Sequence, residues 1–284
     1  MTVNDYKKEF LLVLPEFYDE MERLNVFYLV MEFVLNFTKA DCVLNGNEVI
    51  SAEKQSEINQ IVLRLQNNEP IQYITGKGYF FGYEFKVTPN TLIPRPETEE
   101  LVDWVLTEMI KQPNKNWRVL DIGTGTGCIP ITIKKEYGNS EVSAIDVSKE
   151  ALVVAKENAQ LLNAEVTFIE KDILTAELLD SYDIIISNPP YVRNLEKVEI
   201  HENVLQHEPH LALFVDDHDP LIFYRKITEL AHENLADNGM LFFEINQYLK
   251  NEMDEMMKFY FKTIEFRTDF IGNNRMMKAN NKIY

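Results

Sequence analysis

Apolar residues recur at helical spacing through the N-terminal quarter of the chain. Between Pro15 and Phe37 they fall every three or four positions, which places them on one face of a helix. Pro15 suits the first turn of this helix, because an N–H there has no helical partner. Ser51 is a typical N-cap for a second helix, which continues through Leu65. The pattern predicts a small N-terminal helical domain.

The pattern changes at an aromatic stretch, residues 79–87, that glycines punctuate. Gly76, Gly78 and Gly82 stand before and inside this stretch, and the combination predicts a β-hairpin. We therefore place a domain boundary near residue 77, which divides the chain into residues 1–76 and residues 77–284.

From Glu97 onward, helical patterns alternate with short apolar runs. Helices are expected at residues 97–112, 148–162 and 220–236 and after a glycine turn, and strands at residues 117–122, 142–146, 166–169, 182–187 and 240–244. Short apolar runs separated by helices are typical of buried parallel strands, so the sequence predicts an α/β fold with a doubly wound sheet. Ligands of such sheets bind beyond the carboxyl ends of the strands. The residues that follow each strand are therefore the candidates for chemistry.

Composition and charge exclude several classes of protein. The chain has 284 residues, of which 45% are hydrophobic, as in a globular protein. A net charge of −18 argues against binding to nucleic acid, because that affinity rests on clustered Lys and Arg. Two cysteines cannot form a disulfide framework. Neither a signal-peptide pattern nor an apolar run of membrane-spanning length occurs, so we expect a cytoplasmic protein.

A glycine-rich loop follows the first strand of the predicted sheet. Its residues are Gly123, Thr124, Gly125, Thr126 and Gly127. Glycines permit a tight turn and let a ligand approach the backbone closely. The dinucleotide fingerprint requires G-x-G-x-x-G, and Cys128 stands where its third glycine would be. The spacing therefore disfavours NAD or FAD and favours a ligand without a pyrophosphate.

Acidic residues follow the next two strands. Asp146 ends the second strand and suits a carboxylate that accepts two hydrogen bonds from a ribose diol, although NAD enzymes also use an acid there. Asp172 follows the third strand and would accept a hydrogen bond from an adenine amino group. The backbone N–H of Ile173 would then serve the ring nitrogens. These positions indicate a nucleoside without identifying it.

The fourth strand is followed by Asn188-Pro189-Pro190-Tyr191, the most specific motif in the chain. A planar amino group conjugated to a carbonyl or a ring is a poor nucleophile, because its lone pair is delocalised. Its two hydrogens would be accepted by the side-chain oxygen of Asn188 and the carbonyl of Pro189, which draws electron density to the nitrogen. The prolines stiffen these acceptors, and Tyr191 would stack on the flat group. The motif predicts catalysis by positioning and electrostatic preorganisation.

Together these motifs resemble a known enzyme family. The glycine loop, Asp146 and residues 188–191 are similar to class I S-adenosylmethionine-dependent methyltransferases that modify planar amino groups, including those of DNA adenine and ribosomal RNA guanine. Further segments, which extend the resemblance over nearly the whole chain, resemble the HemK/PrmC family of release factor glutamine methyltransferases. They are residues 69–76, 92–99, 208–214, 223–225 and 269–275.

The resemblance implies a fold, a cofactor and a substrate. The fold is a doubly wound, mostly parallel, seven-stranded Rossmann-like methyltransferase sheet with a small N-terminal helical domain that helps to bind the substrate. The cofactor is S-adenosylmethionine, which becomes S-adenosylhomocysteine. The substrate is the side-chain amide nitrogen (N5) of the glutamine in the Gly-Gly-Gln motif of peptide chain release factors.

The family also implies roles for individual residues. The cofactor is expected to contact Gly123, Thr124, Gly125, Thr126, Gly127, Asp146, Asp172, Ile173 and Asn188. The substrate is expected to contact Asn188, Pro189, Pro190, Tyr191 and Arg95, with Asn188, Pro189 and Tyr191 as the catalytic residues. Arg95 would pair with a carboxylate or a backbone group in the pocket, with a surface position as the alternative. The chain departs from many members at Asn246, where they have glycine, and at residues 215–218.

Two alternative functions make different predictions for the sequence. A DNA or RNA amino-group methyltransferase predicts a basic face and a recognition module, and neither is evident in this acidic chain. A non-catalytic scaffold of the same fold would not need residues 188–191. The five histidines show no H-x-x-x-H pair, so we expect no metal site. We further expect a monomer that does not bind nucleic acid or a membrane.

Overall fold

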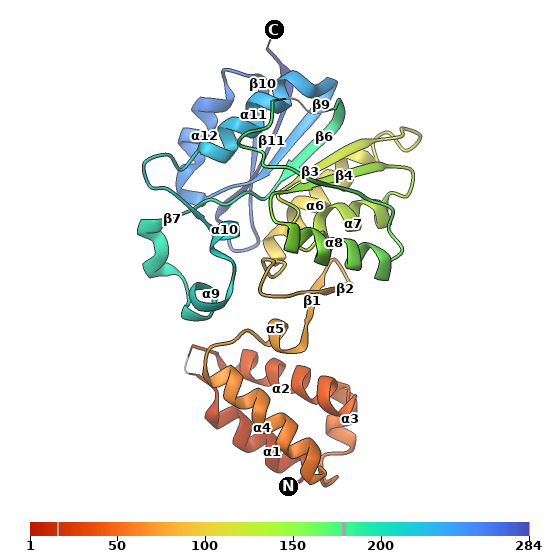
Figure 1. Cartoon of the computed structure of the whole chain (residues 1–284), viewed down its shortest axis with the longest axis vertical. Helices are drawn as coiled ribbons and strands as arrows, with labels where there is room; N and C mark the ends of the chain where they lie inside the picture. Colours follow the sequence, from red (N-terminus) through yellow and green to blue (C-terminus); the bar gives the residue numbers. More distant parts are fainter. Residues whose placement is uncertain (16, 178–179, 284) are drawn as a thin grey trace. The chain divides into compact units, whose positions relative to one another are not determined.

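The structure is a computed structural model that describes residues 1–15, 17–177 and 180–283. The chain forms two compact units (Figure 1). The first comprises Met1–Lys77 together with His201–His207, and the second comprises Gly78–Ile200 and Glu208–Tyr284. The pattern along the chain places a boundary near residue 77, where the chain passes from one unit to the other. It gives no sign that residues 201–207 group with the N-terminal helices.

The first unit is helical. Its helices are α1 (Val3–Val13), α2 (Glu20–Leu35), α3 (Lys39–Leu44), α4 (Ala52–Gln66), α5 (Ile71–Thr75) and α9 (Glu202–His207). The expected start at Pro15 of the helix that reaches Phe37 is wrong, because Asp19 and Glu22 form a capping box that begins α2 later. The Asp19 carboxylate accepts from the Glu22 N–H at 2.8 Å, and the Glu22 carboxylate accepts from the Asp19 N–H at 2.9 Å. Pro15 therefore lies in the connection between α1 and α2.

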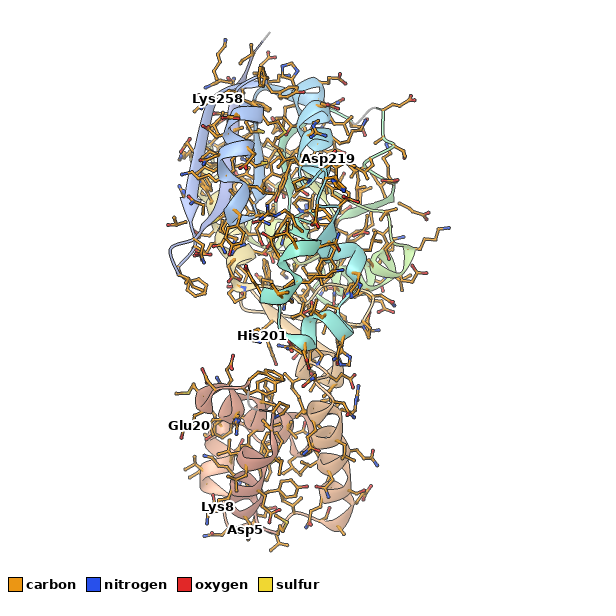
Figure 2. All side chains as sticks on the ribbon, turned by 90° about the vertical axis from the view of Figure 1, so that its left-hand side faces the viewer. Asp5, Lys8, Glu20, His201, Asp219 and Lys258 are labelled. Atoms are coloured by element: carbon orange, nitrogen blue, oxygen red, sulfur yellow. The ribbon has the colours of Figure 1, made fainter. Side chains whose placement is uncertain are left out.

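The apolar faces of these helices form one core. Phe27 and Met31 of α2 are fully buried and pack in one cluster with Phe10 and Ile58. The rings of Phe10 and Phe27 meet edge to face, with centroids 5.5 Å apart. Residues 201–207 join this unit at its surface, where Asn68 Nδ2 donates to the Glu202 carboxylate at 3.1 Å. Figure 2 labels His201, the first residue of this segment.

The second unit is built on a seven-stranded sheet. Its strands are β3 (Arg118–Ile122), β4 (Glu141–Asp146), β5 (Thr167–Glu170), β6 (Tyr182–Ser187), β9 (Leu235–Glu244), β10 (Phe261–Thr268) and β11 (Asn274–Lys282). The strand order is β10-β11-β9-β6-β3-β4-β5. Strand β11 runs antiparallel to both of its neighbours, and the pairs from β9 to β5 are all parallel. The order reverses after β3, so the carboxyl ends of β3, β4 and β6 form the switch point where ligands bind. The doubly wound α/β fold is confirmed.

Helices cover both faces of this sheet (Figure 1). The hairpin β1 (Lys77–Phe80) and β2 (Tyr83–Lys86) packs on one face with α6 (Pro96–Met109), α7 (Cys128–Glu136) and α8 (Lys149–Leu161). The other face is covered by α11 (Ile222–Asn234) and α12 (Lys250–Met257). Shorter elements complete the unit: β7 (Val192–Arg193), a 3-10 turn (Asn194–Glu199), α10 (His210–Leu213), β8 (Phe214–Val215) and a second 3-10 turn (Gln247–Leu249). No described helix has the length and apolar character needed to cross a membrane.

Two features of the sheet differ from the sequence pattern. Strand β9 begins at Leu235, before the expected start at residue 240, so α11 ends at Asn234 rather than at residue 236. The early part of β9 contains the exposed polar residues Asp237 and Asn238, which hide it from a search for apolar runs. The pattern also does not locate β10 and β11. Strand β10 lies at the sheet edge, and only its first residue, Phe261, is buried, so it lacks the continuous apolar run of a central strand.

Candidate active site

A cavity of about 260 Å³ lies in the second unit at the carboxyl edge of the sheet. The loops after β3, β4, β5 and β6 line it, together with residues 89–95, which precede α6, and residues 209–212. Except for Gly127, every residue singled out in the sequence for cofactor binding borders this cavity. The parallel register explains the convergence, because Ile122 at the end of β3 pairs with Ser187 at the end of β6. Ser187 Oγ donates to the Ile122 carbonyl at 2.6 Å and ties the two ends together.

The glycine loop needs its glycines for two different reasons. Gly123, Gly125 and Gly127 have φ values of 81°, 54° and 80°, a region that disfavours side chains. At Gly127 space is also lacking, because a Cβ atom would lie 2.9 Å from Ile131 Cδ1 and 3.2 Å from Ala155 Cβ. The loop therefore presents bare backbone to the cavity and leads into the N-terminus of α7. This geometry suits close approach of a ligand.

One half-buried and one fully buried carboxyl group lie at this loop. Asp146 Oδ2 accepts a hydrogen bond from the Gly125 N–H, and Oδ1 accepts one from the Ser148 N–H, both at 2.9 Å. Burial raises the pKa of Asp146. Asp121 is fully buried, and neither of its oxygens accepts a hydrogen bond from a described residue. Burial, with a smaller contribution from the charge of Asp146, raises the pKa of Asp121 to about 7. Of the two, only Asp146 borders the cavity, and the loop backbone holds its carboxylate there.

The loop after β5 borders the same cavity. Asp172 Oδ1 accepts a hydrogen bond from the Leu174 N–H at 2.9 Å, which closes a tight turn. The side chain of Ile173 is only 8% exposed, and both residues line the cavity. The turn holds the Asp172 carboxylate and the Ile173 backbone at the cavity wall.

Only one end of the Asn188 side-chain amide is hydrogen-bonded to a described residue. Its Nδ2 donates to Thr98 Oγ1 at 3.2 Å, whereas no described group donates to its Oδ1. Asn188, Pro189 and Pro190 all line the cavity. The backbone of Gly123 passes close to this loop, since a Cβ there would lie 3.8 Å from the Asn188 carbonyl oxygen. The glycine loop and the Asn188 loop therefore share one cavity.

Tyr191 is held from behind the cavity. Its hydroxyl donates to Glu244 Oε1 at 2.9 Å. Burial, assisted by the charge of Glu244, raises the pKa of Tyr191. The hydroxyl therefore stays neutral and acts as a hydrogen-bond donor. Tyr191 is not among the residues that line the cavity itself.

Arg95 pairs with a carboxylate, as the first of the two expectations for it states. The Arg95 guanidinium donates to Glu208 Oε1, and the Ile93 N–H donates to Glu208 Oε2 at 3.1 Å. The side chain of Glu208 is 1% exposed and that of Arg95 is 32% exposed. Glu208 thus fixes the segment 93–95, which forms part of the cavity wall.

Several residues of the site are not identified by the sequence pattern. The sequence predicts no role for Thr98, Glu208 or Glu244, although all three lie in segments named above. Asn246 is named only as a difference from many members of the family that the chain resembles. Glu244 could have been found, because it ends an apolar strand in the same way as Asp146. Thr98 gives no such signal, since it resembles any other polar residue in the first turn of a helix.

The fold and this cavity define a class I methyltransferase whose methyl donor is S-adenosylmethionine. Residues 103–212 match the family model of the methyltransferase small domain, and residues 9–76 match that of the PrmC N-terminal domain. A crystal structure of a methyltransferase from Pyrococcus furiosus shares the fold, with a TM-score of 0.52 and 18% identity over 82% of this chain and 100% of that one.

The particular family follows from close relatives. A release factor glutamine methyltransferase from Flavobacterium psychrophilum is 50% identical over 283 residues, 99% of each chain. Another from Bacteroides thetaiotaomicron is 46% identical over 87% of this chain and 88% of its own. The chain belongs to the release factor glutamine methyltransferase family.

Proposed function

We propose that this protein transfers a methyl group from S-adenosylmethionine to the side-chain amide nitrogen (N5) of the glutamine in the Gly-Gly-Gln motif of peptide chain release factors. The observation that carries the proposal is the Asn188 amide. Its donor side is engaged by Thr98, and its acceptor side carries no donated hydrogen bond from a described group. It lines the cavity that the glycine loop also lines.

The residues at the cavity suit this cofactor. When bound, S-adenosylmethionine supplies an electrophilic methyl group on a positively charged sulfur. Residues Gly123 to Gly127 would hold it through their backbone, Asp146 at the ribose, and Asp172 with Ile173 at the adenine. Asn188 stands between this region and the substrate.

The substrate glutamine is activated by the Asn188 loop. Oδ1 of Asn188 accepts one amide hydrogen, and the Pro189 carbonyl accepts the other, so electron density shifts to the nitrogen. Pro190 completes the wall against which the flat amide rests, Tyr191 supports this loop through its hydrogen bond to Glu244, and Arg95 borders the same cavity. Good alignment of reacting groups contributes up to roughly 7–11 kcal/mol to lowering a barrier.

Proton transfer requires no strong base. The nitrogen becomes much more acidic once it has gained the methyl group, and its surplus proton passes to water. Tyr191 does not serve as the base, because its hydroxyl is committed as a donor to Glu244. Catalysis on this chain is therefore a matter of acceptors and positioning.

We propose that the first unit helps to bind the release factor. Residues 9–76 match the PrmC N-terminal domain, which supports this assignment. The net charge of −18 favours a protein substrate over a nucleic acid. We propose that the protein acts as a monomer in the cytoplasm, with no direct contact to nucleic acid or a membrane.

Labelling of a purified release factor tests the function. With methyl-labelled S-adenosylmethionine, the wild-type factor should gain one methyl group, which mass spectrometry should locate on the glutamine of the Gly-Gly-Gln motif. A Gln→Ala factor is the control and should stay unlabelled. Equal labelling of the two factors, or none of either, overturns the proposal. Filter binding with DNA and RNA at several salt concentrations separates the nucleic-acid alternative.

A further inference from the structure

A chain of hydrogen bonds connects Asn188 to a buried carboxylate. Asn188 Nδ2 donates to Thr98 Oγ1 at 3.2 Å, and Thr98 Oγ1 donates to Glu244 Oε2 at 2.6 Å. The other oxygen of Glu244 accepts from the Tyr191 hydroxyl. Thr98 is 3% exposed and Glu244 is 2% exposed, so water does not compete for these bonds. Helix α6, strand β9 and the loop after β6 supply the three links.

The chain of bonds has only one polarity while Glu244 is ionised. A carboxylate only accepts hydrogen bonds, so Thr98 must give it its single hydroxyl proton. The Thr98 oxygen can then only accept from Asn188, which obliges Asn188 to turn its NH₂ toward Thr98. The amide plane has two ends, so Oδ1 must point the other way. The polarity thus determines which end of Asn188 is offered as an acceptor.

We propose that Thr98 and Glu244 are positioning residues that hold the Asn188 amide with Oδ1 presented to the substrate glutamine. This inference rests on the proposed function, because only a substrate that donates hydrogens needs an acceptor there. A reversed amide would present NH₂ to the NH₂ of the glutamine, and the two donors would repel each other. Glu244 also holds Tyr191, so one carboxylate organises both ends of residues 188–191.

A merely structural role does not account for this arrangement. A buried carboxylate is costly to desolvate, and apolar residues stabilise a sheet end at no such cost. The backbone of Glu244 is also engaged, since the Tyr224 hydroxyl of α11 donates to its carbonyl at 3.1 Å. The carboxylate is therefore held in one place between α6 and the loop after β6.

The charge of Glu244 is governed by groups on every element that faces it. Burial raises its pKa, and Glu97 of α6 adds to that effect. Donation from Thr98 and Tyr191 lowers the pKa, as does the charge of Arg275 on β11. At acidic pH the protonated carboxyl would donate to Thr98, which would then donate to Asn188 and reverse its amide. Turnover should therefore fall on the acid side as Glu244 is protonated.

Substitution of Thr98 is the direct test. Thr98→Val keeps the shape and removes the hydroxyl, and it should lower kcat for release factor by about 10- to 100-fold, since misplaced reacting groups cost this much. The KM for release factor and the Kd for S-adenosylmethionine should stay within about threefold, because valine keeps the shape of Thr98 at the cavity wall and the proposed cofactor-binding residues are untouched. Thr98→Ser restores the hydroxyl and should restore kcat to within about threefold of wild type.

A matched control separates hydroxyl loss from general damage. Thr132 of α7 is fully buried, and its hydroxyl has no described hydrogen-bond partner. Thr132→Val should keep the wild-type kcat. Wild-type kcat in Thr98→Val, or equal loss in Thr98→Ser, overturns the positioning role while leaving the methylation itself intact. Failure of the wild-type enzyme to methylate the factor overturns the proposed function instead.

The pH profile provides an independent test if Thr98→Val folds poorly, as judged by circular dichroism. The wild-type kcat should show an acid limb that Glu244→Gln removes while it lowers the plateau. The glutamine side chain in Glu244→Gln can donate as well as accept a hydrogen bond, so it no longer fixes the direction in which the Thr98 hydroxyl donates. An unchanged acid limb in folded Glu244→Gln contradicts the role of Glu244.

Discussion

The side-chain amide of Asn246 donates a 3.0 Å hydrogen bond to the main-chain carbonyl of Tyr191. The same Nδ2 donates to the Glu196 carboxylate at 2.9 Å, and Asn246 Oδ1 accepts from the Tyr248 N–H at 3.0 Å. Asn246 is 4% exposed. A glycine at this position would supply none of these bonds. In this chain Asn246 therefore fastens the end of residues 188–191 to the end of β9.

Asn246→Gly should destabilise the protein by about 1–3 kcal/mol, because it leaves buried polar groups without partners. We expect kcat to fall as well, since Tyr191 loses a restraint. Chemical denaturation and release-factor methylation measure the two effects. Asn234→Ala removes an amide hydrogen bond within α11 and should leave kcat unchanged. Wild-type stability in Asn246→Gly would show that the loop does not depend on this bond.

Asn188→Ala should retain most of the affinity for S-adenosylmethionine but lose most turnover. Removing one preorganised polar group from an active site lowers kcat by about 100- to 1,000-fold. The Kd for the cofactor should stay within about tenfold, because the glycine loop and Asp146 are untouched. Isothermal calorimetry and single-turnover methylation measure these quantities. Near-normal turnover would refute the acceptor role of Asn188.

Arg95→Ala should raise the KM for release factor and lower stability, because it leaves the buried carboxylate of Glu208 without its cation. Loss of one partner of a buried pair costs about 3–5 kcal/mol, and the exposure of Arg95 reduces the expected loss to about 1–2 kcal/mol. Arg225→Ala is the control, since its ion pair with Asp219 is exposed and such pairs contribute at most about 1 kcal/mol. Equal effects of the two substitutions on KM would contradict a role for Arg95 at the site.

Asp121 should make the stability of the cofactor-free protein fall with rising pH. Its pKa is about 7 in the folded chain and about 3.9 in an unfolded chain, so the unfolded state releases its proton first. The stabilisation is complete below about pH 4 and is lost as pH rises to 7, a change of about 4 kcal/mol. Chemical denaturation at pH 5 and pH 8 should show about 2–3 kcal/mol of this change, because the unfolded carboxyl is already ionised at pH 5.

Asp121→Asn removes this titration and should stabilise the protein at pH 8 relative to wild type. Asp254→Asn, on the exposed part of α12, should leave the pH dependence as it is in wild type. If Asp121→Asn keeps the wild-type slope between pH 5 and pH 8, then Asp121 is not the group that titrates.

The succession of helices and strands is a local property, and the sequence reveals most of it. A buried central strand such as β6 must be apolar on both faces, and a helix such as α6 must be apolar on one. Edge strand β10 is not found this way, because only part of it is buried. The start of α2 is missed because the capping box of Asp19 competes with the apolar pattern that precedes it.

By itself, the sequence determined the doubly wound fold, the glycine loop, and the Asn188 loop that marks chemistry on a planar amino group. These depend on the spacing of neighbouring residues, which any reader of the chain can measure. Only the tertiary structure decided that Thr98 meets Asn188, 90 residues away, and Glu244, 146 residues away. Hydrogen-bond partners so distant along the chain are set by the order of strands and the packing of α6 beside them, which no periodicity encodes. The direction in which Asn188 offers its oxygen is therefore a property of the folded protein.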